Sequence, residues 1–185
     1  MASWSECEAI IQGFKDHYSM TPTQHQLVYK YAMEVPANGV AMELGICYGR
    51  TAALLGYCAK ATGFEAHGID AFILVSDVSA NSLREQLAAV KLPYTIHEGW
   101  TATVPWDRPL DLLIIDASHT DPWVSEDYKR WTPMLKVGGI GLFHDVEASP
   151  DHTSPHYPTY VAAHQYTDGW QEEAYNTGLL VRRKV

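Results

Sequence analysis

The chain has 185 residues, of which 46% are hydrophobic and 19% charged, and its formal net charge is -9 at pH 7. This length fits one domain, in which about 70% of the surface of the unfolded chain can be buried without disulfides or a structural metal. The excess of acidic residues argues against a nucleic-acid binder, because such proteins neutralise phosphates with Lys and Arg.

The three cysteines are widely spaced, which excludes a complete disulfide framework and a Cys-x-x-Cys metal motif, so we expect reduced thiols. The first residues are acidic where a signal peptide would be positively charged, and no segment approaches the ~20 apolar residues of a membrane span. We therefore expect a cytoplasmic protein that acts on a small-molecule substrate. Nucleic acid and membrane are not expected as partners, and a homo-oligomer is left open.

The first predicted element is a helix over residues 23–34. Short apolar runs, typical of strands buried on both faces of a parallel sheet, then alternate with helical stretches. The predicted strands are residues 40–44, 66–69, 94–97, 110–115 and 139–143. The predicted helices between them are residues 51–61, 81–90 and 125–135. This alternation predicts an α/β fold, a doubly wound, mostly parallel Rossmann-like sheet with helices on both faces.

The pattern changes after residue 143. Residues 146–158 hold three prolines and two histidines without periodicity, which predicts a long loop of the kind that often forms a lid or substrate wall. Residues 169–174 and 177–182 are predicted strands, an antiparallel pair that closes the sheet. We thus expect one domain, 1–185, with a helical cap (1–38), a cofactor-binding core (39–145), and a substrate loop with closing strands (146–185).

The turn after the first predicted strand carries Gly45 and Gly49 ahead of a predicted helix. Ligands of open α/β sheets bind over such a turn, where glycines leave space and helix amides bind polar groups. The Gly-x-x-x-Gly spacing is neither the dinucleotide fingerprint nor a P-loop, and taken alone it fits a plain turn equally well. Asp70, at the end of the second strand, is placed to accept hydrogen bonds from ribose hydroxyls.

Four segments follow one another along the chain: Glu43-x-Gly45-x-x-x-Gly49-x-Thr51, Asp70, residues 112–116 (LLIID) and residues 135–139 (LKVGG). In order and spacing, they resemble the class I S-adenosylmethionine (SAM)-dependent methyltransferases. Residues 111–145 look like a small O-methyltransferase-like branch that carries Ile-Asp-x-x-His and ends its fifth strand in His-Asp. The resemblance covers residues 24–145, and residues 177–181 also look like the last strand of that branch.

The resemblance implies SAM as the cofactor and assigns its site by position. Glu43, Gly45 and Gly49 would bind the methionine end, Asp116 its amino group, and Asp70 the ribose, while Gly99 and Trp100 would border the adenine. Trp100 fits a core or surface aromatic equally well.

The candidate catalytic residues follow two neighbouring predicted strands. Methyl transfer to a hydroxyl needs an aligned acceptor whose proton is removed or whose oxygen is bound to a cation. Similarity to metal-dependent catechol-type O-methyltransferases implies that Asp116, His144 and Asp145 bind the metal and that Asp116 and His119 are catalytic, with His119 as the base. That branch has a carboxylate at position 144 and a lysine at position 119. The imidazoles shift the expected cation from Mg²⁺ toward Mn²⁺, Fe²⁺ or Zn²⁺.

The main prediction is a SAM-dependent methyltransferase that methylates a small-molecule hydroxyl with help from a divalent cation. Two alternatives stay open. Asp116, His119 and His144 supply the residue types of a two-His-one-carboxylate iron site, which would make the protein a non-heme iron oxygenase. A non-catalytic protein of this fold, binding a nucleoside or acting in assembly, is the other.

The aromatic and histidine residues of the C-terminal region point less clearly to a site. An aromatic acceptor pocket or a small core would each explain Trp123, Tyr157, Tyr160 and Tyr166. No ligand motif fits the spacing of three further histidines, which we expect to be solvated: His152, His156 and His164.

Overall fold

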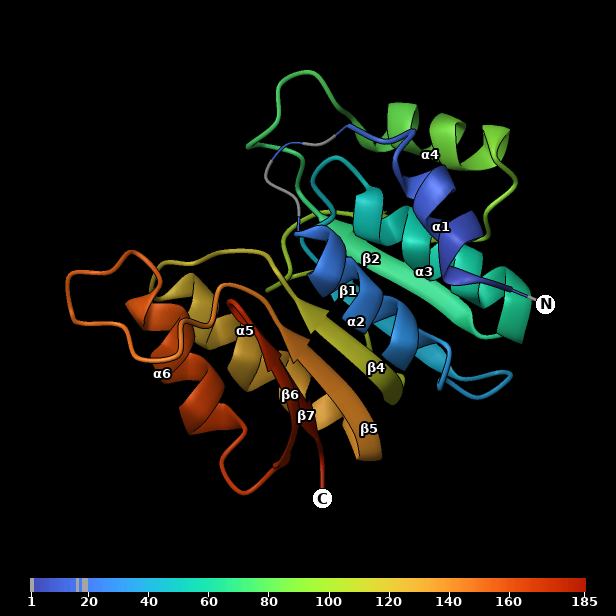
Figure 1. Cartoon of the computed structure of the whole chain (residues 1–185). Helices are drawn as coiled ribbons and strands as arrows, with labels where there is room; N and C mark the ends of the chain where they lie inside the picture. Colours follow the sequence, from blue (N-terminus) through green and yellow to red (C-terminus); the bar gives the residue numbers. More distant parts are fainter. Residues whose placement is uncertain (1, 16, 18–19) are drawn as a thin grey trace.

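The computed structural model describes residues 2–15, 17 and 20–185. Within this part of the chain, a central sheet of seven strands has the order β3-β2-β1-β4-β5-β7-β6 (Figure 1). The strands are β1 (Val40–Leu44), β2 (Glu65–Asp70), β3 (Thr95–Glu98), β4 (Leu110–Ile115), β5 (Leu135–Phe143), β6 (Gln171–Asn176) and β7 (Leu179–Arg183). Strands β1 to β5 are parallel to one another, whereas β7 is antiparallel to β5 and to β6. The predicted α/β sheet with an antiparallel C-terminal pair is confirmed.

Helices cover both faces of the sheet (Figure 1). They are α1 (Trp4–Ile11), α2 (Pro22–Ala32), α3 (Arg50–Thr62), α4 (Ala80–Ala89), α5 (Trp123–Trp131) and α6 (Tyr157–Tyr166), with a 3₁₀ turn at Thr132–Met134. Side chains of α1 to α4 form one apolar core, and those of α5 and α6 form another. Strand β1 serves both cores because its side chains alternate, with Ala41 in the first and Met42 in the second.

Two helices differ from the sequence prediction. Helix α1 buries only Cys7 and Ile11, so its apolar pattern is weak. Helix α6 begins within the predicted loop, and Pro158 lies in its first turn. Backbone N–H groups there have no partner within the helix, so a proline removes no hydrogen bond. The loop therefore ends at His156, two residues earlier than predicted.

The start of β5 also differs. The predicted helix 125–135 ends at Trp131, and β5 begins at Leu135 rather than at Gly139. Gly138 has a φ of 85° and β5 changes register against β4 at this end, so the Gly138-Gly139 pair bends the strand instead of preceding it. The three cysteines are free. In the described ranges, the helices are too short or too polar to cross a membrane.

Candidate active site

The glycine loop joins β1 to α3. Gly45 and Gly49 have φ angles of 86° and 84°, a region that favours glycine. A side chain on Gly45 would also clash with the carbonyl of Asp116, and one on Gly49 would clash with Leu83. The loop therefore requires both glycines for its own packing, a reason that the sequence alone did not indicate.

A cavity open to solvent lies over the end of β1, and its space, open solvent included, is about 300 Å³. Glu43 and Asp116 line it together with the glycine loop and the first residues of α3, and Lys15, His17 and Met20 complete its wall. The structure thus gathers four of the predicted cofactor-binding residues, Glu43, Gly45, Gly49 and Asp116, around one cavity.

Glu43 is buried at the bottom of this region and has a partner that the sequence analysis missed. The hydroxyl of Tyr94 donates a 2.6 Å hydrogen bond to Glu43 Oε2, and burial raises the pKa of this carboxyl well above its usual range. Tyr94 reaches Glu43 across β2, where a side chain on Gly68 would clash with its hydroxyl. A glycine inside a strand was the available signal, because it often marks a close approach.

Asp70 fastens the glycine loop to the end of β2. Its Oδ2 accepts hydrogen bonds of 2.8 Å from the amides of Ile46 and Cys47, and its Oδ1 accepts one of 2.6 Å from Phe72. Each carboxylate oxygen can accept two hydrogen bonds, so Asp70 Oδ1 can accept a further one from a ribose hydroxyl. Its ribose role stays a prediction.

Gly99 and Trp100 lie beside Asp70, because the Gly99 amide donates a 2.9 Å hydrogen bond to the Asp70 carbonyl. Trp100 is half exposed and stacks on Trp123, with ring centroids 6.1 Å apart. Among the described residues, neither tryptophan lines the cavity. The adenine role of Gly99 and Trp100 is therefore still a prediction.

The four candidate catalytic residues meet at the carboxyl edge of the sheet. Asp116 follows β4, and His144 and Asp145 follow the neighbouring β5. His144 Nδ1 lies 3.0 Å from Asp116 Oδ1 and 3.4 Å from Asp145 Oδ2. His119 Nε2 lies 3.1 Å from Asp145 Oδ2 and 3.8 Å from Asp116 Oδ1. Each histidine therefore stands between the same two carboxylates.

The carboxylates set the charge of this cluster. Burial works against a charged His144, but Asp116 and Asp145 outweigh it and raise its pKa to about 10. The nearby carboxylate of Asp116 is the main cause of a raised pKa at His119. Burial opposes ionisation of both acids, and the neighbouring histidines nevertheless hold the pKa of each below its usual range. The cluster thus attracts positive charge.

Two overlapping groups of side chains have the spacing of metal ligands among the described residues. One contains Asp116, His144 and Asp145, and the other contains His119, Asp145 and His156. In each group, one ligand atom per residue lies within 4.8 Å of the others. The first group is the predicted metal site, and the second includes a histidine that the sequence analysis expected to be solvated.

His156 corrects that expectation. It precedes α6 as its N-cap residue, and its ring lies edge-on to that of His119, with centroids 5.5 Å apart. Of the other two histidines, His152 is exposed as expected, and Nδ1 of His164 lies 2.8 Å from the Tyr160 carbonyl. No sequence spacing could place His156, because its position depends on the path of a whole loop.

Residues 42–146 match a protein family described as a methyltransferase domain, over more than half of the chain. The chain belongs to this methyltransferase family. TomG of Streptomyces achromogenes, an O-methyltransferase involved in tomaymycin synthesis, has been solved in complex with SAM. It matches with a TM-score of 0.65 and 16% identity, over 98% of this chain and 89% of that chain. A SAM-dependent O-methyltransferase of Thermotoga maritima gives a TM-score of 0.67 and 13% identity, over 97% of this chain and 71% of that chain. The predicted class I methyltransferase fold is confirmed.

The four aromatic residues considered for an acceptor pocket make stacking and core contacts in the described structure, and a pocket role for them stays a prediction. Tyr160 and Tyr166, which lie on α6, pack against the apolar core formed by α5 and α6. Trp123 stacks on Trp100. Tyr157 stacks on Tyr160, with centroids 6.5 Å apart. Within the described ranges, these side chains lie outside the lining of the cavity over β1.

Proposed function

We propose that this methyltransferase transfers the methyl group of SAM to a hydroxyl of a small-molecule acceptor, with a divalent cation held by Asp116, His144 and Asp145. One observation carries the proposal: Asp116 belongs both to the cavity over the glycine loop and to the cluster of candidate metal ligands. A cofactor in the cavity and an acceptor at the cation would therefore lie on either side of one side chain.

The cavity suits the amino-acid end of SAM. The first amides of α3 have no partner within the helix, and they favour a carboxylate. Asp116, on the other wall, offers a carboxylate to an ammonium group. The nucleoside end would extend past Asp70, which is bonded to the loop, toward Gly99 and Trp100.

The donor set suits a divalent cation. Two carboxylates and one imidazole can bind Mg²⁺, and the imidazole favours Mn²⁺ or Fe²⁺. His144 must give up its proton to bind, so we expect affinity to rise with pH. A cation bound here would fix the acceptor oxygen and favour its deprotonated form.

His119 is proposed as the base. It lies in the loop between β4 and α5, and its Nε2 faces Asp145 and Asp116. An acceptor hydroxyl held at the cation site would be next to this nitrogen, which would take the proton as the methyl group moves. Asp116 positions the acceptor and the cofactor from opposite sides.

The iron-oxygenase alternative receives no support at the three residues for which it was predicted. Asp116, His119 and His144 do not together form one of the groups with metal-ligand spacing in the described part of the chain. Membership of a methyltransferase family favours methyl transfer, and it also weakens the non-catalytic alternative.

Transfer of labelled methyl groups tests this proposal. The enzyme is treated with a chelator and assayed with SAM and a panel of small phenols and catechols, with or without added Mn²⁺. Matched amines and thiols serve as control acceptors. We expect methylated hydroxyl products that depend on the cation. Methylation of amines or thiols alone, or equal rates without a cation, would refute the proposed chemistry.

A further inference from the structure

The second group of candidate ligands, His119, Asp145 and His156, has the spacing of a metal site. We propose that these three residues bind a transition-metal ion of the Zn²⁺, Co²⁺ or Fe²⁺ type in preference to Mg²⁺, at a position separate from the site of Asp116 and His144. Asp145 is the only residue that the two described groups share.

The contacts within the group are those of ligands around a common centre. His119 Nε2 lies 3.1 Å from Asp145 Oδ2, and the ring of His156 approaches that of His119 at 62° without stacking. Nε2 of His119 and Nδ1 of His156 are both buried, and neither makes a hydrogen bond to a described residue. Buried nitrogens normally have hydrogen-bond partners or ligands, and a metal ion between these two nitrogens and Asp145 would serve as one.

The chain fixes His156 in place before any metal binds. The amide of His156 donates a 3.1 Å hydrogen bond to Ser154 Oγ, which donates one of 3.0 Å to Glu147. Glu147 is two residues from Asp145, and the intervening Val146 is bonded through its amide to the Gly178 carbonyl. The loop is thus tied to the segment that carries the carboxylate, and α6 begins immediately after His156.

Ligand chemistry separates the two sites. The first group offers two carboxylates and one imidazole, whereas the second offers two imidazoles and one carboxylate. Nitrogen donors select transition metals over Mg²⁺, which prefers oxygen. A carboxylate shared between neighbouring cations is a familiar arrangement in two-metal sites.

Occupancy of the second site has a consequence that rests on the proposed function. A metal bound to His119 occupies the nitrogen that would take the acceptor proton. We therefore expect Zn²⁺ to inhibit methyl transfer at concentrations that fill the second site, and a chelator to restore it.

Metal titrations test the site without cofactor or acceptor. Chelator-treated protein is titrated with Co²⁺, followed by its visible absorption, and with Zn²⁺, followed by calorimetry. The variants are His156→Ala and Asp116→Asn, each expected to impair one site, and His152→Ala is the matched control from the same loop. Thermal melts confirm that each variant is folded, and His156→Gln replaces His156→Ala if the latter is not.

We expect wild type and His152→Ala to bind alike. His156→Ala should lose one equivalent of Co²⁺ or bind it at least ~10-fold more weakly, a difference that corresponds to about 1.4 kcal/mol. Asp116→Asn should keep the equivalent that depends on His156, and excess Mg²⁺ should not displace it. Unchanged binding in His156→Ala, or equal loss in His152→Ala, would overturn the proposal.

A separate titration with S-adenosylhomocysteine distinguishes this result from the proposed function. Metal binding that depends on His156, without any nucleoside binding, would refute the methyltransferase mechanism and leave the metal site standing. Nucleoside binding without metal binding that depends on His156 would refute the second metal site and leave the methyltransferase mechanism standing.

Discussion

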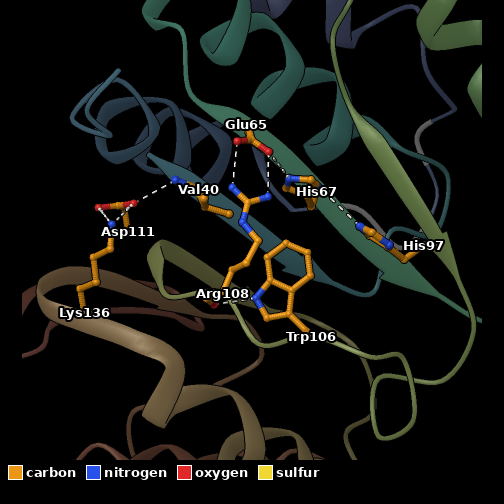
Figure 2. A network of polar contacts seen from close by, with 8 residues as sticks. All are labelled: Val40, Glu65, His67, His97, Trp106, Arg108, Asp111 and Lys136. Atoms are coloured by element: carbon orange, nitrogen blue, oxygen red, sulfur yellow. Dashed lines mark hydrogen bonds and ion pairs between the residues drawn. The ribbon is translucent and has the colours of Figure 1, made fainter. Parts of the chain in front are cut away.

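At the amino end of the sheet Asp111 and Glu65 each meet a cation, whereas at the carboxyl end Asp116 and Asp145 share two histidines. Figure 2 shows the amino-end network, in which Lys136 and the Val40 amide bind Asp111 at 2.8–2.9 Å. In the same network, the guanidinium group of Arg108 donates a 2.8 Å hydrogen bond to each carboxylate oxygen of Glu65. The carboxylates of Asp111 and Glu65 at the amino end thus have their ionic partners within the chain.

The carboxyl end is not satisfied in the same way. Hydrogen bonds from Arg108 are the main reason that the pKa of Glu65 falls to about 2, so this carboxylate stays ionised beside its partner. Asp116 and Asp145 must instead be neutralised by His144, whose pKa rises to about 10, and His119 Nε2 is buried without a hydrogen bond to a described residue. A cluster that stabilises the fold completes its own pairs, whereas a binding site leaves capacity for a ligand.

The largest expected effect is on catalysis at the carboxyl end. His119→Ala should lower kcat by ~100-fold or more, because general-base catalysis contributes about that much. Affinity for S-adenosylhomocysteine should change by less than ~3-fold, since His119 does not line the cavity in the described structure. Steady-state rates and calorimetry check this. Equal losses of turnover and of affinity would show that His119 is not the base.

At the amino end, the same type of change should affect stability instead. Asp111→Ala leaves the Val40 amide and Lys136 without their bonds to this carboxylate. We expect the free energy of unfolding to fall by ~1–3 kcal/mol, measured by urea denaturation. The folded fraction should keep wild-type affinity for S-adenosylhomocysteine. If Asp111→Ala were as stable as wild type but bound S-adenosylhomocysteine more weakly, the amino end would not be purely structural.

Asp127 on α5 is a third kind of carboxylate for this comparison. It is buried, and its hydrogen-bond partner is the hydroxyl of Thr101 rather than a pair of histidines. Burial raises its pKa to about 6, although Thr101 donates a hydrogen bond to it. The folded protein therefore holds the Asp127 proton more tightly than the unfolded chain. The stability from this proton is complete below pH ~4 and is lost as the pH rises through about 6.

Asp127→Asn cannot ionise and can still accept the bond from Thr101. Relative to wild type, it should gain ~1–3 kcal/mol of stability between pH 4 and pH 7.5, as followed by urea denaturation at each pH. A constant difference across this range would mean that Asp127 is ionised in the folded protein throughout.

The smallest effect is expected at Glu65, which is half exposed. Glu65→Gln should lower the melting temperature slightly at low salt, because its bond with Arg108 is solvated. The difference from wild type should shrink at ~1 M salt, where the screening length falls to about 3 Å. A loss as large as that in Asp111→Ala, or one that salt does not reduce, would contradict this ranking.

The sequence predicted the parts of the fold that depend on local composition. Strands β1 and β4 were predicted with the observed bounds, since they are short apolar runs buried on both faces. Helices α1 and α6 were missed, the first because it buries only two residues and the second because its prolines suggested a loop. The strand predicted over residues 139–143 starts four residues earlier, at Leu135, so both glycines lie within β5.

The same distinction applies to the candidate site. Asp116, His144 and Asp145 could be grouped in advance because the carboxyl ends of adjacent parallel strands lie at one edge. Tyr94 and His156 could not, because each reaches its partner through a path that no local pattern records. Tyr94 crosses β2 to Glu43, and His156 is brought close to His119 by the loop over residues 144–156.

Calorimetric titration of chelator-treated protein with S-adenosylhomocysteine, repeated in Mg²⁺ and in Mn²⁺, tests the central claim most directly. The account predicts one site of micromolar affinity without added metal. It also predicts binding of Mn²⁺ that is lost in Asp116→Asn. Absence of nucleoside binding by folded protein under all three conditions would contradict it.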